Sequence, residues 1–232
     1  FVDFALLAAN PSRSAWMSAA DLVDMYLAEP DPPQVIDLSG GQPDLVPEWV
    51  PWMMRELLSR GLAESVYLWS DDNLSNDYLW RFLSDEDVEL IATYRNYGRV
   101  CCFKGFDENS FAFNTCAEPG LFDRQFALMS RLRELGVDLY GYVTLTSPSV
   151  AHVREAMPQF VDRLQQIHEK LPLRVVPLKI EVFSPVVARL DAAKNDALHN
   201  QWVAVDAWQR ELQLRFPASD LAEDIVDIKL RS

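Results

Sequence analysis

VIDLSGGQPDL, residues 35–45, is the segment that best indicates how this chain folds. Its first four residues are mostly apolar and rich in β-branching, which is typical of a buried strand. The paired glycines Gly40 and Gly41 then predict a turn in which no Cβ shields the backbone, and Pro43 stiffens its exit. Strands that end in backbone-lined loops form the ligand sites of α/β proteins. A plain strand-to-helix turn is the competing interpretation.

Composition predicts a single α/β domain over residues 1–232, with 185–232 as its C-terminal extension. Hydrophobic residues make up 49% of the chain, enough for a core, and the formal net charge is −14. This charge argues against nucleic acid and anionic membranes as partners, because both bind basic surfaces. The apolar runs are too short to span a bilayer. The three cysteines form no disulfide framework, which indicates a reducing, cytoplasmic setting.

Strand and helix patterns alternate about five times along the chain. Strands are expected at 35–38, 65–69, 99–103, 137–144 and 174–183, and helices at 18–27, 48–59, 77–95, 121–135, 149–170 and 199–215. Spacings of roughly 30–40 residues predict βα units and a parallel sheet. Because about five units fall short of the eight in a closed barrel, we expect an incomplete barrel.

Several motifs occur in an order that resembles the radical S-adenosylmethionine (radical SAM) superfamily, most closely the activating enzymes that generate radicals on other proteins. GGQP at 40–43 is similar to that family's Gly-Gly-Glu-Pro loop, and Asn10-Pro11 to the dipeptide after its cluster-binding loop. FKGFD at 103–107 resembles a strand-end Leu-Lys-x-Phe-Asp. LRELGV at 132–137 and the strand at 142–145 resemble the elements that follow. The similarity runs from about residue 8 to residue 185.

This resemblance implies a partial, (βα)6-type TIM barrel whose first strand is missing from this chain. It also implies S-adenosylmethionine as cosubstrate. The implied binding residues are Ser39, Gly40, Gly41 and Gln42 for the amino group, Lys104 for the carboxylate or ribose, and Ser70, Asp71 and Thr144 at the ends of other strands. The competing interpretations are a solvated turn around Asp71 and Asp72, and structural roles for Lys104 and Thr144.

The cysteine motif that defines this family, Cys-x3-Cys-x2-Cys, is absent. Its three ligands would stand just before Asn10-Pro11, where this chain has Phe1, Ala5 and Ala8. A [4Fe–4S] cluster needs thiolates there, so the chain as written cannot hold a cluster at that place. Cys101, Cys102 and Cys116 cannot substitute, because they fall on a different strand and loop. Engineered replacement, a natural cluster-less relative and a cluster loop upstream of residue 1 all remain open.

The family uses its reduced cluster to cleave S-adenosylmethionine to methionine and a 5′-deoxyadenosyl radical, which abstracts hydrogen from a substrate. The resemblance therefore implies the metal-binding core of such an enzyme, inactive in this form. A protein substrate and a reductant such as flavodoxin or ferredoxin are implied in the same way. The alternative is a cluster-less module that binds S-adenosylmethionine or a protein partner. An unrelated phosphate-binding α/β barrel is the third hypothesis, and no catalytic residue is identified.

Overall fold

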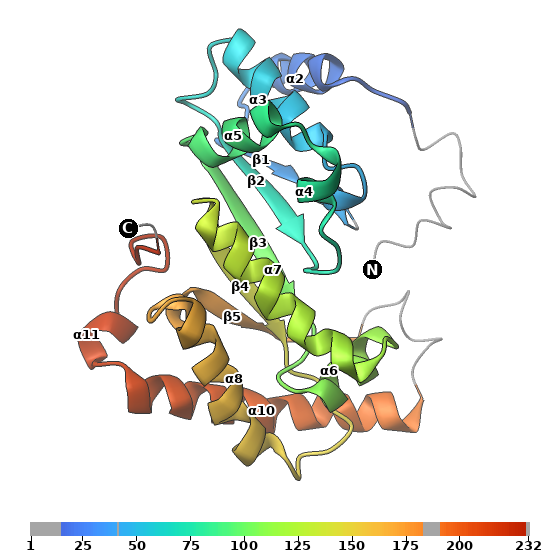
Figure 1. The fold of residues 1–232 in the computed structure, drawn as a ribbon, viewed down its shortest axis with the longest axis vertical. Coiled ribbons are helices and arrows are strands. Elements are labelled where there is room, and N and C mark those ends of the chain that lie inside the picture. Colours follow the sequence, from blue (N-terminus) through green and yellow to red (C-terminus); the bar gives the residue numbers. More distant parts are fainter. Residues whose placement is uncertain (1–14, 41, 183–190, 231–232) are drawn as a thin grey trace. The chain divides into compact units, whose positions relative to one another are not determined.

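The structure, a computed structural model, describes residues 15–40, 42–182 and 191–230. Its strands are β1 (Val35–Leu38), β2 (Tyr67–Asp72), β3 (Tyr97–Phe103), β4 (Asp138–Thr144) and β5 (Val175–Leu178). They form a parallel sheet in the order β1-β2-β3-β4-β5, with helices between successive strands (Figure 1). The prediction of an α/β protein with parallel strands is confirmed.

The described helices include the six predicted ones, but 77–95 forms two helices, α10 begins at Ala192 instead of 199, and α6 and α11 were not predicted. They are α2 (Ala19–Ala28), α3 (Trp49–Ser59), α4 (Tyr78–Phe82), α5 (Asp85–Thr93), α6 (Glu108–Thr115), α7 (Phe122–Glu134), α8 (Val153–Ile167), α10 (Ala192–Arg215) and α11 (Ala218–Leu221). Short 3-10 turns lie at η2 (Pro43–Leu45), η3 (Pro119–Leu121) and η4 (Leu171–Arg174).

Capping side chains decide where several helices begin. Ser18 caps α2 as predicted: its Oγ accepts a hydrogen bond from the Asp21 N–H at 3.2 Å, and the Asp21 carboxylate accepts one from the Ser18 N–H at 2.8 Å. The segment 77–95, predicted as one helix, is two, because Ser84 caps α5 by accepting from the Asp87 N–H at 3.2 Å.

Two further helix predictions are corrected. The prediction omits α6, which begins because the Asp107 carboxylate accepts from the Ser110 N–H at 2.7 Å. It also starts α8 too early, at Ser149. This helix begins at Val153, four residues later.

The strands differ from the prediction in burial and length. Strand β1 is mostly exposed rather than buried: Val35 is 48% exposed, and Leu38 at 3% is its one buried residue. Among the described strands β1 ends the sheet, so it has a strand neighbour on one side only. Strand β2 continues through Asp72, which is 4% exposed, so the solvated turn predicted around Asp71 and Asp72 is wrong.

The chain divides into two compact units. Among the described residues, unit 1 comprises 15–40, 42–72, 76–100 and 135–138, and unit 2 comprises 73–75, 101–134, 139–182 and 191–230. Helices α2, α3 and α5 lie together beside β1 and β2 (Figure 1), and their buried apolar side chains contribute to the core of unit 1. Its fully buried members include Val23, Val50, Met54 and Leu57.

An aromatic cluster forms the core of unit 2. Phe160 of α8 lies at its centre, with ring centroids 5.7 Å from Phe103 of β3, 5.8 Å from Phe126 of α7 and 6.0 Å from Trp208 of α10. Such tilted and edge-to-face contacts add to the free energy of burial. No helix in the described part of the chain combines the length and apolar character needed to cross a bilayer.

Phe160→Ala should destabilise the protein strongly, because it removes the ring that contacts three buried aromatic neighbours. We expect a loss of about 3–5 kcal/mol in the free energy of unfolding, measured by urea denaturation. Leu214→Ala on α10 is the control, since Leu214 is 80% exposed and its loss should cost less than about 0.5 kcal/mol. Equal losses in the two variants would contradict this account of the core.

Candidate functional site

A buried ion cluster lies directly under the glycine loop in unit 1. The guanidinium of Arg99, on β3, binds both oxygens of Asp44 (Nη1–Oδ2 2.7 Å, Nη2–Oδ1 3.1 Å) and also Asp72 of β2 (Nη1–Oδ2 3.1 Å). The exposed fractions of the three side chains are 1%, 2% and 4% for Arg99, Asp44 and Asp72. We call these three residues the buried triad.

Hydrogen bonds extend the triad on both sides. Arg99 Nε donates to the Tyr97 hydroxyl at 3.0 Å, and this hydroxyl lies 2.7 Å from Ser70 Oγ. On the other side, Gln42 Nε2 donates to Asp72 Oδ1 at 3.1 Å. The β2 residue Ser70 and the loop residue Gln42 therefore belong to a single polar network.

The carboxyl of Asp44 is buried beside the Arg99 guanidinium and a second carboxylate, and these surroundings shift its proton affinity. Burial raises the pKa of Asp44 to about 6: Arg99 opposes this rise and the nearby Asp72 adds to it. For Arg99, burial disfavours the charged form, but Asp44, Tyr97 and Asp72 outweigh it and hold the pKa above its ordinary value. The guanidinium is therefore permanently charged, whereas the carboxyl of Asp44 titrates in the physiological range.

The polar network holds the side chains of the residues that follow the two glycines, whereas Gly40 itself is exposed. Gln42 and Asp44 anchor the end of the loop, and η2 closes it with a hydrogen bond from the Val46 N–H to the Pro43 carbonyl at 3.0 Å. Gly40 has φ +105°, and no atom lies within 4 Å of an added Cβ. This position favours glycine for its backbone conformation, and the space beside it is free.

One face of the sheet in unit 1 carries carboxylates and aromatic rings. Asp37 of β1 lies in register with Trp69 of β2, so the alternation of a strand places both, with Tyr67 and Asp71, on the same face. None of these four side chains is buried. Burial and the charge of Asp71 raise the pKa of Asp37. The face therefore favours a cation, and its rings, with Tyr67 and Trp69 centroids 6.2 Å apart, offer a surface for a flat ligand.

The predicted binding residues are divided between the two units. Ser39, Gly40, Gln42, Ser70 and Asp71 lie in unit 1, at the carboxyl ends of β1 and β2. Ser39 and Gly40 are exposed, and Ser70 is fully buried in the polar network. Lys104 and Thr144 belong to unit 2, at the ends of β3 and β4, where both are half-buried. Gly41, Phe1, Ala5 and Ala8 lie outside the described residues.

A half-buried amide fixes two loops of unit 2. Asn114 of α6 donates through Nδ2 to the carbonyls of Lys104 and Thr146, each at 3.0 Å, and its Oδ1 accepts from Thr146 Oγ1 at 2.6 Å. Asn200 of α10 donates to the carbonyl of Ser147 at 3.0 Å. The loops after β3 and β4 are therefore held by side chains from helices.

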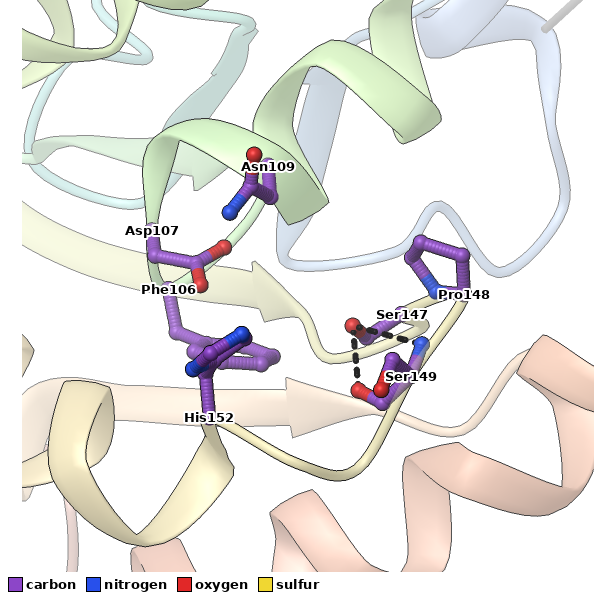
Figure 2. Close-up of a pocket in the computed structure, with 7 residues that line it drawn as sticks. All are labelled: Phe106, Asp107, Asn109, Ser147, Pro148, Ser149 and His152. Atoms are coloured by element: carbon purple, nitrogen blue, oxygen red, sulfur yellow. Dashed lines mark hydrogen bonds between the residues drawn. The ribbon is translucent and has the colours of Figure 1, made fainter.

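These loops enclose a pocket of about 230 Å³. Figure 2 shows Asp107 and Asn109 on one side, Ser147, Pro148 and Ser149 on the other, and His152 beside the ring of Phe106. The Ser147 hydroxyl donates to the Ser149 carbonyl at 2.9 Å, so its proton is directed away from His152. The lining suits a small polar ligand and does not form the hydrogen-bonded Ser–His pair of a nucleophilic site.

The described cysteines do not form a cluster site. Cys101 is buried in β3, its neighbour Cys102 is half-buried on the opposite face of that strand, and Cys116 is exposed at the end of α6. Residues 15–40, 42–182 and 191–230 contain no group of three His, Cys, Asp or Glu side chains placed to bind a metal ion.

Neither a comparison with protein-family models nor a comparison with curated proteins finds a match for this chain. The assignment to the radical SAM superfamily therefore stays a prediction from the motifs.

Sequence reasoning missed the residues that fix both loops. Arg99 is the first residue of a predicted strand, but sequence does not show that it faces Asp44, 55 positions away. The signal that could have found it is a charged residue in an otherwise apolar strand. Asn114 carried no signal, because the prediction contained no helix at its position.

Asp44→Asn should remove a pH-dependent part of the stability. The pKa of Asp44 is about 6 in the folded protein against an ordinary value of 3.8, so its contribution is complete below about pH 4 and is lost as the pH rises through 6. At about 1.4 kcal/mol per tenfold change in proton affinity, this loss is on the order of 3 kcal/mol. We expect the free energy of unfolding of the unaltered protein, relative to Asp44→Asn, to fall by that amount, measured in urea between about pH 4 and pH 7.

Asp87→Asn is the matched control, with the opposite sign. Burial raises the pKa of Asp87, but hydrogen bonds from Ser84 and Arg55 outweigh this and lower it overall. Its contribution is present above its ordinary pKa and is lost as the pH falls through its lowered value. A difference between the unaltered protein and Asp44→Asn that stays flat with pH would show that Asp44 is not a buried acid of high pKa.

Proposed function

We propose that this chain is the core of a radical-SAM-like partial barrel that binds S-adenosylmethionine beside the glycine loop of unit 1. One observation supports the proposal: at this loop, an exposed glycine lies close in sequence to two residues whose side chains are held by the buried triad. Gly40 is exposed, with open space where a side chain would lie, whereas the side chains of Gln42 and Asp44 bind residues of the buried triad. A ligand can then bind the main chain without first ordering the loop, which lowers the entropic cost of binding.

The chemistry of the surrounding face suits this ligand. S-adenosylmethionine carries a sulfonium and an ammonium group, and Asp37 and Asp71 supply negative charge on the exposed face of β1 and β2. Because the pKa of Asp37 is raised, its anion is destabilised, and a nearby cation would relieve this. Trp69 and Tyr67 offer aromatic faces for the adenine ring or the sulfonium.

The proposal also includes the type of barrel that the sheet forms. Parallel strands joined by helices, with one exposed face of the sheet in unit 1, are consistent with a partial (βα)6 barrel whose ligand lies at the carboxyl ends of the strands. Lys104 and Thr144 lie at the ends of β3 and β4 in unit 2, and their role as ligand residues stays a prediction from the family resemblance.

The residues present do not fit a [4Fe–4S] cluster, and we derive no radical step for this chain. The described cysteines lie on opposite faces of β3 and at the end of α6, and positions 1, 5 and 8 carry Phe, Ala and Ala. These residues favour a binding core without a cluster, rather than an active enzyme, for this chain of 232 residues. The net charge of −14 would suit a basic protein partner of such a core.

Calorimetric titration of S-adenosylmethionine into Asp37→Asn should give a dissociation constant about fivefold higher than for the unaltered protein, because a partly exposed charge pair contributes roughly 1 kcal/mol. Asp31→Asn is the control: it makes the same charge change before the amino end of β1, and Asp31 is exposed. S-adenosylhomocysteine lacks the sulfonium charge, so its affinity should depend less on Asp37. The absence of binding by the unaltered protein would refute the proposal.

Restoring the missing thiolates tests the family resemblance separately. The triple variant Phe1→Cys, Ala5→Cys and Ala8→Cys, reconstituted with iron and sulfide under anaerobic conditions, should become brown and lose its colour in air. Iron content and the visible absorbance band measure the outcome, with the variant carrying serine at the three positions as control. A triple-cysteine protein that stays colourless would contradict the placement of a cluster loop at these positions.

A further inference from the structure

The pocket of unit 2 is lined by side chains whose hydrogen-bonding capacity the described part of the chain does not use. The Asp107 carboxylate caps α6 through Oδ1, which accepts from the Ser110 N–H at 2.7 Å and from Ser110 Oγ at 2.6 Å. No described residue binds its Oδ2, and the carboxylate is directed into the space between the two loops (Figure 2). The Asn109 amide and the His152 ring also line the pocket without a hydrogen-bond partner among the described residues. These groups are available to a ligand.

Hydrogen bonds within unit 2 hold both loops in place before any ligand binds. In the loop after β3, the N–H groups of Phe106 and Asp107 donate to Ser110 Oγ at 3.0 Å and 3.1 Å. In the loop after β4, the Ser147 carbonyl accepts from Asn200 Nδ2 at 3.0 Å. Binding therefore does not require these loops to become ordered first, which lowers its entropic cost.

The pocket has a buried floor, an open rim and room for a small molecule. Phe106 is 2% exposed and Ser147 is 5% exposed, whereas Asn109, Ser149 and His152 are exposed. At about 30 Å³ for each water molecule, the volume of about 230 Å³ holds roughly eight groups of that size. A small molecule with several polar groups fits this volume, whereas a drug-sized ligand needs about 300–1,000 Å³.

The mixture of groups selects a neutral ligand that carries several hydroxyls. The negative charge of Asp107 opposes an anion. A cation would use the carboxylate but would find donors in the Asn109 amide and in the Ser149 hydroxyl, whose oxygen already accepts from the Ala151 N–H at 3.2 Å. A hydroxyl group both donates and accepts, so a ligand with several hydroxyls can satisfy the carboxylate, the amide and the serine together.

We propose that the pocket of unit 2 binds a small neutral polyol, a sugar or sugar alcohol of about four to six carbons. Asp107 Oδ2 accepts from one hydroxyl of this ligand, and the Asn109 amide and the Ser149 hydroxyl bind others. The apolar surfaces of Phe106 and Pro148 pack against its C–H groups. All the residues that line the pocket belong to unit 2, so this site does not depend on the ligand proposed for unit 1.

NMR titration of the ¹⁵N-labelled chain with xylitol and with ribose, a linear and a cyclic five-carbon polyol, tests this site. Amide signals of the loops at 105–110 and 146–152 should shift and saturate. Asp107→Asn should raise the dissociation constant about tenfold, because it replaces the free charged acceptor by an amide donor. The fold should be kept, since asparagine also caps helices. Asp191→Asn is the matched control: it makes the same change at the N-cap of α10, where Asp191 accepts from the Lys194 N–H at 2.8 Å, and it should leave the affinity unchanged.

Asn109→Ala and two charged probes complete the test. Asn109 is exposed, so its loss should leave the fold intact and raise the dissociation constant about threefold, the effect of one neutral hydrogen bond. Ethylammonium and inorganic phosphate should not shift the same signals. Binding of xylitol alone or of ribose alone would support the proposal and show whether the ligand is linear or cyclic. The proposal is overturned if neither polyol binds, if a charged probe binds instead, or if Asp107→Asn and Asn109→Ala both bind as tightly as the unaltered protein.

Discussion

A single guanidinium with two carboxylate partners is the constraint on which the candidate site depends. Arg99 holds Asp44 through two hydrogen bonds and Asp72 through one, and all three are almost completely buried. Removing one partner of such a cluster leaves an uncompensated charge, which costs about 3–5 kcal/mol, so the position of the loop is enforced strongly.

Because of this constraint, some residues at the glycine loop are held in place by their side chains, whereas Gly40 is exposed. Side chains of Gln42 and Asp44 point into the polar network, whereas Gly40 exposes main-chain groups in a conformation that a Cβ would strain. A ligand that binds beside Gln42 therefore meets a side chain that is already held in place. The carboxylates and aromatic rings on the neighbouring sheet face then select the kind of ligand, and they favour a flat cation over an anion.

In unit 2, side chains also hold loops in place, but these side chains are uncharged. Asn114 ties Lys104 to Thr146, and Asn200 ties a second helix to the loop after β4, so helix side chains order the loops around the pocket. An amide side chain satisfies donors and acceptors without a net charge. The pocket of unit 2 is therefore not expected to respond to pH through these supports, in contrast to the loop of unit 1.

The sequence by itself determined the order of strands and helices, the parallel sheet and the glycine loop, because these follow from local periodicity, capping and turn chemistry. It located Ser39, Gly40 and Gln42 at a strand end, but it misjudged β1 as buried and Asp72 as a solvated turn. Only the tertiary structure decided that Arg99 meets Asp44 and Asp72, and that Asn114 joins two loops. These contacts bring together residues 27 to 55 positions apart, and no local pattern records which side chains will face each other once the sheet is assembled.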